Sequence, residues 1–190
     1  MSLHTHYFYA LELPGDIKEI LKDTIHVLKG EMPFKTWVHP QDLHITLAFL
    51  GNAPEAKIKA ANELIEAALN NTTTFKLEIN NLGIFGRKDS PRIFWAGLEK
   101  SSELNEVREA VFSSCTTAGF SLETRPFSPH ITIARKWLGE EAFEAGQLEA
   151  VNPFKKELTF HAERVVLYKT HLGKSPKYEP ITLFPLAKQE

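Results

Sequence analysis

Apolar and polar positions in the first half of the chain follow two periods. Short runs of β-branched and aromatic residues with alternating polarity predict strands, and apolar residues three or four positions apart predict helices. The runs that predict strands are 6–13, 43–50 and 74–82, and the runs that predict helices are 16–29 and 54–69. Segment 32–41 contains two prolines and is expected to be an ordered loop. The first half is therefore predicted to be β-α-β-α-β.

The second half of the chain repeats this order of elements. The expected strands are 92–98, 129–135 and 154–160, and the expected helices are 101–118 and 140–148. Two further strands, 164–168 and 181–185, are expected to form a C-terminal hairpin within 163–186. The polar, glycine-containing segment 83–91 lies between the halves. We expect it to be the boundary between two lobes.

One short pattern occurs once in each half. The two copies are Leu43-His44-Ile45-Thr46-Leu47-Ala48 and Pro129-His130-Ile131-Thr132-Ile133-Ala134. Residues two apart on a strand share a face, so His44 and Thr46 point one way and the intervening isoleucine points the other. His130 and Thr132 repeat the arrangement. Each copy is therefore predicted to present an imidazole beside a hydroxyl group on one face of a strand.

The spacing of the two copies indicates an internal duplication. The histidines are 86 residues apart (44 to 130), which is far too long a period for a solenoid repeat. It suits two similar lobes related by an approximate two-fold axis, with duplicated halves at about 5–82 and 91–160. We expect a single bilobal domain over 1–190 with an α+β fold. Its β-α-β-α-β units would form two lobes with mainly antiparallel sheets around a central cleft.

Two facing imidazoles suit acid–base chemistry on a phosphate. Opening a cyclic phosphodiester needs a base to take a proton from the attacking water and an acid to protonate the leaving oxygen. Two imidazoles can supply both near neutral pH, whereas one could supply only half of the chemistry. His44 and His130 are therefore the predicted catalytic residues. Thr46 and Thr132 are predicted to hold the non-bridging phosphate oxygens and stabilise charge in the transition state.

Composition narrows the class of protein. A formal net charge of −2 means that any contact with nucleic acid must be local. Cys115 is the single cysteine, so neither an intrachain disulfide nor a thiolate metal cluster can form. No histidine or acidic residues show metal-ligand spacing, so we expect neither a metal ion nor a cofactor. Because the sequence shows neither a signal core nor a membrane-spanning run, we expect a cytoplasmic monomer that does not contact the membrane.

The paired motifs resemble the two-histidine (2H) phosphoesterase superfamily, and more narrowly the RNA 2′,3′-cyclic phosphodiesterases, also called 2′-5′ RNA ligases. The resemblance rests on segments 43–51, 91–98, 125–136 and 165–178. It implies metal-independent hydrolysis of 2′,3′-cyclic phosphate ends of RNA or nucleotides to 2′-phosphates, with reversible 2′-5′ RNA ligation as a further reaction. One departure is visible. The family often has an arginine just before the Phe and Ala of the first strand, where this chain has His6-Tyr7-Phe8-Tyr9-Ala10.

The resemblance also assigns roles to individual residues. It implies that Arg135 binds phosphate, that Phe49 stacks on a base, and that His44 is the acid and His130 the base. Arg135 and Phe49 each follow their motif histidine by five residues, and strict alternation would place them on the opposite face unless the strand ends, twists or bulges. The alternatives are core packing for Phe49 and a surface charge for Arg135. Arg125 would either line the cleft or form a structural ion pair.

Two other functions compete with RNA end hydrolysis. The first keeps the chemistry but acts on a small cyclic nucleotide or on ADP-ribose cyclic phosphate. The second belongs to another class, a non-catalytic module that binds RNA or nucleotides. Both histidines and both threonines are present, which favours an enzyme over a binding module.

Overall fold

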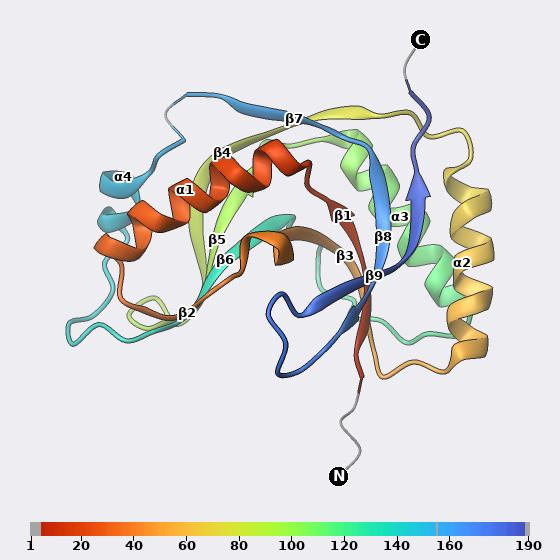
Figure 1. Cartoon of the computed structure of the whole chain (residues 1–190), viewed down its shortest axis with the longest axis horizontal. Coiled ribbons are helices and arrows are strands. Elements are labelled where there is room, and N and C mark those ends of the chain that lie inside the picture. The colour runs from red at the N-terminus through yellow and green to blue at the C-terminus, as the bar shows by residue number, and fades with distance from the viewer. Residues whose placement is uncertain (1–4, 155, 189–190) are drawn as a thin grey trace.

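A nine-stranded sheet runs through the part of the chain that the computed structural model describes, residues 5–154 and 156–188 (Figure 1). Its order is β7-β4-β5-β6-β3-β1-β8-β9, and β2 pairs with β6. The strands are β1 (Tyr7–Glu12), β2 (Phe34–Trp37), β3 (His44–Gly51), β4 (Phe75–Gly86), β5 (Pro91–Leu98), β6 (His130–Trp137), β7 (Leu158–Ala162), β8 (Arg164–Thr170) and β9 (Tyr178–Pro185). The helices are α1 (Gly15–Glu31), α2 (Glu55–Leu69), α3 (Ser102–Thr117) and α4 (Gly146–Val151), with a 3₁₀ turn η1 (Pro40–Asp42).

The two motif strands lie side by side at the centre of the sheet. β3 and β6 are antiparallel and pair at one position, Ile45 with Ile131, and both side chains are fully buried. This pairing joins two half-sheets, β7-β4-β5-β6 and β3-β1-β8-β9. The named strand pairs are all antiparallel, which confirms the predicted α+β class with mainly antiparallel sheets.

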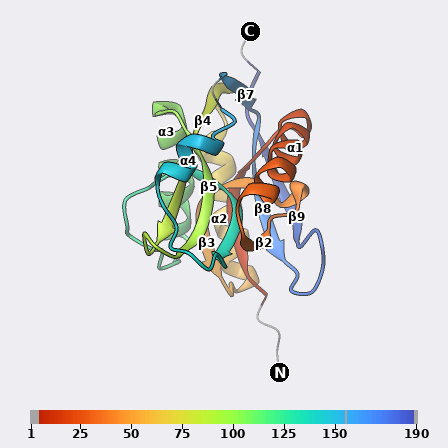
Figure 2. The same cartoon turned by 90° about the vertical axis from the view of Figure 1, so that its left-hand side faces the viewer.

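The helices cover the sheet and leave the motif strands central. α2 packs against α3 and β9, and α3 also contacts β3, whereas α4 contacts β4. Figure 2 shows α1 and α3 on opposite sides of the central strands. The apolar stripe predicted for the first helix is buried, at Ile17, Leu21, Ile25 and Leu28. None of the helices within 5–154 and 156–188 has the length and apolar content needed to cross a membrane.

Segment 32–41 differs from its prediction, because it contains a strand. The two prolines, Pro33 and Pro40, flank β2 and do not interrupt it. Phe34 pairs with Trp137 of β6, and its ring stacks on Phe94 at a centroid distance of 5.0 Å. The strand therefore exists because a distant part of the chain supplies its hydrogen-bonding partner, which a local pattern does not reveal.

Segment 83–91, expected to be a polar connection between two lobes, is partly strand. β4 continues to Gly86 and pairs with β5, so that the connection is a short turn. A Cβ added at Gly83 would lie 2.1 Å from the Trp95 indole, so glycine is required there by close cross-strand packing. β4 also pairs with β7, and β8 pairs with β1. Strands from the sequence halves 5–82 and 91–160 therefore pair with each other within one sheet.

Two element positions near the second motif were also wrong. The helix expected at 140–148 is observed at Gly146–Val151, and the strand expected at 154–160 is observed at Leu158–Ala162. The chain after β6 folds back instead of forming a helix, because Trp137 Nε1 donates to the Glu141 carbonyl at 3.1 Å and Phe143 packs edge-on against the Trp137 ring. The C-terminal hairpin predicted within 163–186 is confirmed as β8 and β9.

Candidate active site

The His–Thr pairs lie on one face of the two central strands. The His44 Nε2 atom is 3.0 Å from Thr46 Oγ1, so both side chains point the same way, opposite to buried Ile45. Strand alternation places His130 and Thr132 opposite buried Ile131 in the same manner. Since Ile45 and Ile131 are paired, each histidine is one residue from the joint between the half-sheets. The structure thus brings together the two predicted pairs.

Each imidazole is held by a backbone carbonyl two residues earlier. His44 Nδ1 lies 2.7 Å from the Asp42 carbonyl oxygen, and His130 Nδ1 lies 2.8 Å from that of Ser128. A carbonyl oxygen only accepts hydrogen bonds, so both Nδ1 atoms carry a proton. The proton on Nδ1 leaves Nε2 of each neutral ring as an acceptor, which in His44 takes the hydrogen bond of the Thr46 hydroxyl group. Each Nε2 atom can accept a proton when its ring is neutral and donate one when its ring is charged. Sequence analysis missed these carbonyl groups.

A matching β-bulge in each motif strand removes the conflict over Arg135 and Phe49. In the pairing of β3 with β1, Leu47 has no partner residue. In the pairing of β6 with β5, Ile133 has no partner residue. Each skipped residue is the third after its motif histidine, and the residue after it is buried as well. A bulge adds one residue to one strand and so reverses the alternation beyond it. The fifth residue after each histidine therefore returns to the histidine face.

Contacts agree with this placement. Phe49 pairs with Phe8, whose ring lies 4.8 Å from the His44 ring. The Phe49 residue is 56% exposed, so the core-packing alternative is excluded. Burial is the main cause of a lowered pKa for both imidazoles, and the positive charge of Arg135 lowers both pKa values further. Arg135 and Phe49 are therefore placed on the histidine face, and their roles in binding phosphate and stacking on a base stay predictions.

Aromatic rings enclose both imidazoles. The rings that pack around His44 are Phe8, Tyr168 and Tyr178, and those around His130 are Phe85 and Trp95. Phe85 meets the His130 ring edge-on, with the centroids 4.8 Å apart. These residues were not predicted as part of the site. Phe8, Trp95 and Tyr168 lie on predicted strands, whereas Phe85 and Tyr178 lie in segments that were predicted as loops. The sequence did not show which strands lie beside the motifs.

This environment lowers the pKa of both histidines. Burial lowers the pKa of His44 to about 4, and the hydrogen bond to the Asp42 carbonyl only partly opposes the effect. Burial likewise lowers the pKa of His130, and the charge of Arg135 adds to it. Both rings are therefore mainly neutral at pH 7 in the free protein. A bound phosphate would favour the charged form of each and raise both pKa values.

These shifts predict a specific pH dependence for hydrolysis of a cyclic phosphodiester. The active form has one charged and one neutral imidazole, so kcat/KM should rise and then fall with pH. Because the pKa of each imidazole is lowered in the free protein, the falling limb of kcat/KM should lie at a pH below 6.5, the usual pKa of an imidazole. The limbs of kcat should lie higher, because substrate is then bound. Measuring both from about pH 4 to 9 tests this; a kcat/KM that still climbs above neutral pH would contradict it.

Arg125 lies apart from this arrangement. Its side chain is 81% exposed and forms a salt bridge of 3.2 Å with Glu123. The cleft-lining role given to Arg125 stays a prediction, and the contact observed is the ion-pair alternative. Among residues 5–154 and 156–188, no group of three or more His, Cys, Asp or Glu side chains is placed to hold a metal ion.

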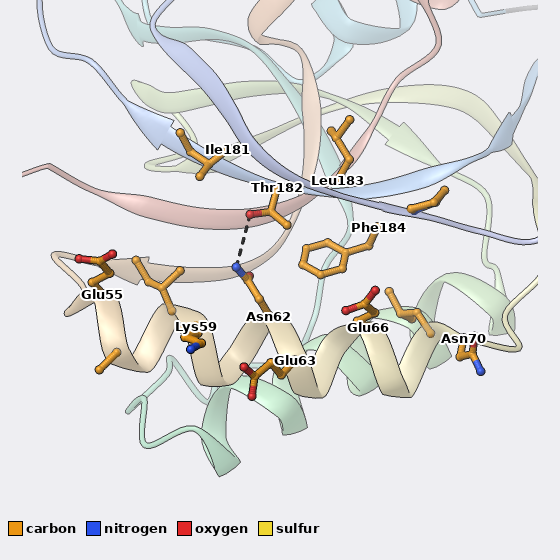
Figure 3. A pocket seen from close by; sticks show the side chains of 14 residues that line it. Glu55, Lys59, Asn62, Glu63, Glu66, Asn70, Ile181, Thr182, Leu183 and Phe184 are labelled. Atoms are coloured by element: carbon orange, nitrogen blue, oxygen red, sulfur yellow. Dashed lines mark hydrogen bonds between the residues drawn. The ribbon is translucent and has the colours of Figure 1, made fainter.

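A groove lies away from the motif face, between α2 and β9. It has a volume of about 970 Å³, and its lining contains none of the motif residues. Figure 3 shows Asn62 of α2 pointing toward Thr182 of β9, with a hydrogen bond of 3.3 Å from Asn62 Nδ2 to Thr182 Oγ1. The Tyr9 hydroxyl donates to Asn62 Oδ1 at 2.6 Å. These contacts hold the helix against the strand, and the predicted catalytic residues lie outside this groove.

Two His–Thr pairs on adjacent central strands of an antiparallel α+β sheet are the arrangement of a two-histidine phosphoesterase. The sequence model of one family, described as the 2′-5′ RNA ligase superfamily, matches residues 17–174. The chain belongs to the 2′-5′ RNA ligase superfamily, as the resemblance predicted.

Two relatives carry the name RNA 2′,3′-cyclic phosphodiesterase. The protein from Geobacillus stearothermophilus is 42% identical over 182 residues, which cover 96% of this chain. The chain spans only 57% of the length of that relative. The protein from Bacillus subtilis (strain 168) is 36% identical over 189 residues, which cover 98% of this chain and 99% of the relative.

Solved structures share the fold. Escherichia coli LigT in its apo form matches with a TM-score of 0.73 at 24% identity, covering 97% of this chain and 98% of LigT. TT0787 of Thermus thermophilus matches with a TM-score of 0.75 at 22% identity, covering 97% of this chain and 100% of TT0787. At these identities the likeness supports the fold alone.

Proposed function

We propose that this protein hydrolyses RNA 2′,3′-cyclic phosphate ends to 2′-phosphomonoesters by side-chain acid–base catalysis. The observation that carries the proposal is the common geometry of His44 and His130. Each ring is fixed through Nδ1 to a carbonyl group and leaves Nε2 for proton transfer. Two relatives with the corresponding name, which match almost the whole chain, support the substrate class.

In the proposed reaction, water attacks phosphorus while the bond from phosphorus to the ribose O3′ breaks. The Nε2 atom of His130 takes a proton from the water, and the charged His44 gives its Nε2 proton to O3′. The products are a 2′-phosphate and a free 3′-hydroxyl. Thr46, Thr132 and Arg135 hold the non-bridging oxygens, where charge develops in the transition state. The assignment of His44 as the acid follows the family resemblance.

The same groups can catalyse 2′-5′ ligation. A 5′-hydroxyl of a second RNA would replace water as the nucleophile, and the base would take its proton. Phosphorus would then be linked to the 2′ oxygen of one RNA and the 5′ oxygen of the other, with O3′ again leaving. The reverse reaction uses the two imidazoles in exchanged roles.

Substrate selection is proposed to be local. With a net charge of −2, the protein has no overall positive field for RNA, so binding depends on groups at the site. Phe49 is exposed on the motif face and offers its ring to a base next to the cyclic phosphate. We further propose that the enzyme acts as a cytoplasmic monomer. Sedimentation of the purified protein would test the monomeric state.

Product analysis tests the function. A 2′,3′-cyclic mononucleotide and a short RNA with a 2′,3′-cyclic end would be incubated with purified protein, with and without excess EDTA. We expect a 2′-phosphate from both, at rates that EDTA leaves unchanged, because side chains supply the acid and the base. A 3′-phosphate product, or activity lost in EDTA and restored by a divalent ion, would contradict the mechanism.

The same assay separates the alternatives. Binding without turnover would indicate a nucleotide-binding module. Turnover of the mononucleotide or of ADP-ribose cyclic phosphate, with none of the RNA, would indicate a small-molecule phosphodiesterase.

A further inference from the structure

Asp42 is a buried carboxylate that connects the first motif to a distant loop. The residue is only 4% exposed. Its Oδ1 and Oδ2 atoms accept hydrogen bonds from the Lys177 backbone N–H at 3.1 and 3.0 Å, and Oδ1 also accepts from the Tyr178 N–H at 3.0 Å. Its own carbonyl accepts the Nδ1 proton of His44. One residue thus holds both an imidazole and the loop between β8 and β9.

A second buried charged group, Lys18, lies near Asp42. Lys18 of α1 is 6% exposed, and its Nζ atom donates to the Gln41 carbonyl at 3.2 Å. Asp42 is among the charges that act on the Lys18 ammonium group. A buried carboxylate is costly unless it is paired and hydrogen-bonded, and such a pair often adds little net stability. The three backbone hydrogen bonds that Asp42 accepts are the contacts that satisfy this carboxylate, and they point to a role in geometry.

The tethered loop brings Tyr178 against the active site. The Tyr178 ring meets the His44 ring edge-on, with centroids 5.3 Å apart and an angle of 85° between the planes. It also packs edge-on against Phe8 at 4.8 Å. Because Asp42 binds the backbone N–H of Tyr178 itself, the position of this ring depends directly on the carboxylate.

The loop also has a contact of its own that does not reach the motif. His171 pairs with Glu179, and the His171 N–H donates to the Lys177 carbonyl at 2.7 Å. These contacts close the hairpin on itself. The Asp42 contacts instead attach the hairpin to the segment that carries His44. The two kinds of contact can therefore be removed separately.

We propose that Asp42 is a positioning residue of the active site. Through the backbone of Lys177 and Tyr178 it places the Tyr178 ring against His44, so that the imidazole keeps Nε2 directed at the phosphate. Its kinetic consequence rests on the proposed hydrolysis. Displacements of about 1 Å can cost about 10²-fold in rate, so the tether should affect kcat more than KM.

The test compares Asp42→Ala and Asp42→Asn with Glu179→Gln as the matched control. We expect Asp42→Ala to lower kcat by about 10-fold to 10²-fold with little change in KM. Asp42→Asn keeps an oxygen for the Tyr178 N–H but turns an amide donor toward Lys177, so its loss should be smaller. Glu179→Gln weakens the loop's own contact and should stay within about two-fold of the parent. An unchanged kcat in both Asp42 variants would overturn the proposal.

A double-mutant cycle with Tyr178→Leu separates positioning from general destabilisation. If Asp42 acts through the Tyr178 ring, the loss caused by Asp42→Ala should shrink to a few-fold in the Tyr178→Leu background. Additive losses would overturn the proposal and leave Asp42 a role in stability. Should Asp42→Ala fail to fold, Asp42→Asn, which preserves the side-chain volume, replaces it in the cycle.

A readout that does not need turnover keeps this proposal distinct from the proposed function. Amide hydrogen exchange at Lys177 and Tyr178, and the NMR titration of His44, should change in both Asp42 variants and not in Glu179→Gln. If the Asp42 variants show these changes but the parent protein hydrolyses no cyclic phosphate, the proposed function is refuted and the tether is retained. Unchanged exchange and an unchanged His44 titration would refute the tether, whatever the activity.

Discussion

Replacing either His44 or His130 with alanine is expected to lower kcat for cyclic phosphate hydrolysis by about 10²-fold to 10⁴-fold, the usual range for a positioned acid or base. Each variant lacks one of the two proton transfers. The double variant should be little slower than either single one, because residues that act as a unit are not additive. Steady-state kinetics on a 2′,3′-cyclic mononucleotide would measure all three.

The fold should survive both substitutions. The side chains that anchor the motif strands are buried Ile45 and Ile131 on the opposite face, and neither is altered. His161→Ala is the matched control, because His161 is an exposed strand histidine outside the motifs. Thermal unfolding should confirm that all variants are folded at the assay temperature. A single variant that keeps most of the parent activity would remove that histidine from the mechanism.

Replacing Arg135 with methionine is expected to lower kcat by about 10²-fold, since it removes a charged donor to the phosphate in the transition state. Arg135→Lys should fall between the parent and Arg135→Met, because an ammonium group keeps the charge but not the forked geometry of a guanidinium group. The pH profile gives a second readout. Burial is the largest cause of the lowered pKa of both imidazoles, and the charge of Arg135 is a smaller one. Removing this charge should therefore move both limbs of kcat/KM to higher pH.

The neighbouring residue is a suitable control for this prediction. Lys136 is exposed and has a backbone φ of 62°. Methionine, like lysine, is unbranched at Cβ, so the substitution removes the charge and adds no new backbone constraint. We expect Lys136→Met to retain activity and the pH limbs of the parent. Arg135→Met with unaltered limbs would mean that the guanidinium does not lie beside the imidazoles in solution.

The sequence predicted those elements whose pattern lies within a short stretch of the chain. The repeated His-Ile-Thr sequence, the alternation around it and the C-terminal hairpin each follow from residues close together in the chain. β2 depends on a distant partner, whereas the hairpin between β4 and β5 joins neighbouring strands and was missed because its polar, glycine-containing residues are typical of a loop. Phe34 needs β6, and Gly83 is explained only by the Trp95 ring that lies across it.

The site shows the same division. Strand alternation predicts the faces on which His44 and His130 lie, but the face on which Arg135 lies depends on a bulge. A bulge is a property of pairing between two strands, so the skipped residue Ile133 looks like any other strand residue in the sequence. Asp42 was missed for a related reason. Its hydrogen-bonding partners, Lys177 and Tyr178, lie 135 and 136 residues further along the chain.

The single pairing of Ile45 with Ile131 also has a mechanical consequence. Each half-site, an imidazole with its hydroxyl and its carbonyl anchor, comes from one motif strand and the two residues before it. The angle between the half-sheets is restrained at this point by one residue pair rather than by a continuous ladder of backbone hydrogen bonds. A small hinge rotation there would change the gap between the two Nε2 atoms and leave each half-site intact. The gap could then close on a cyclic phosphate and widen to release a product, with the isoleucine pair as the pivot.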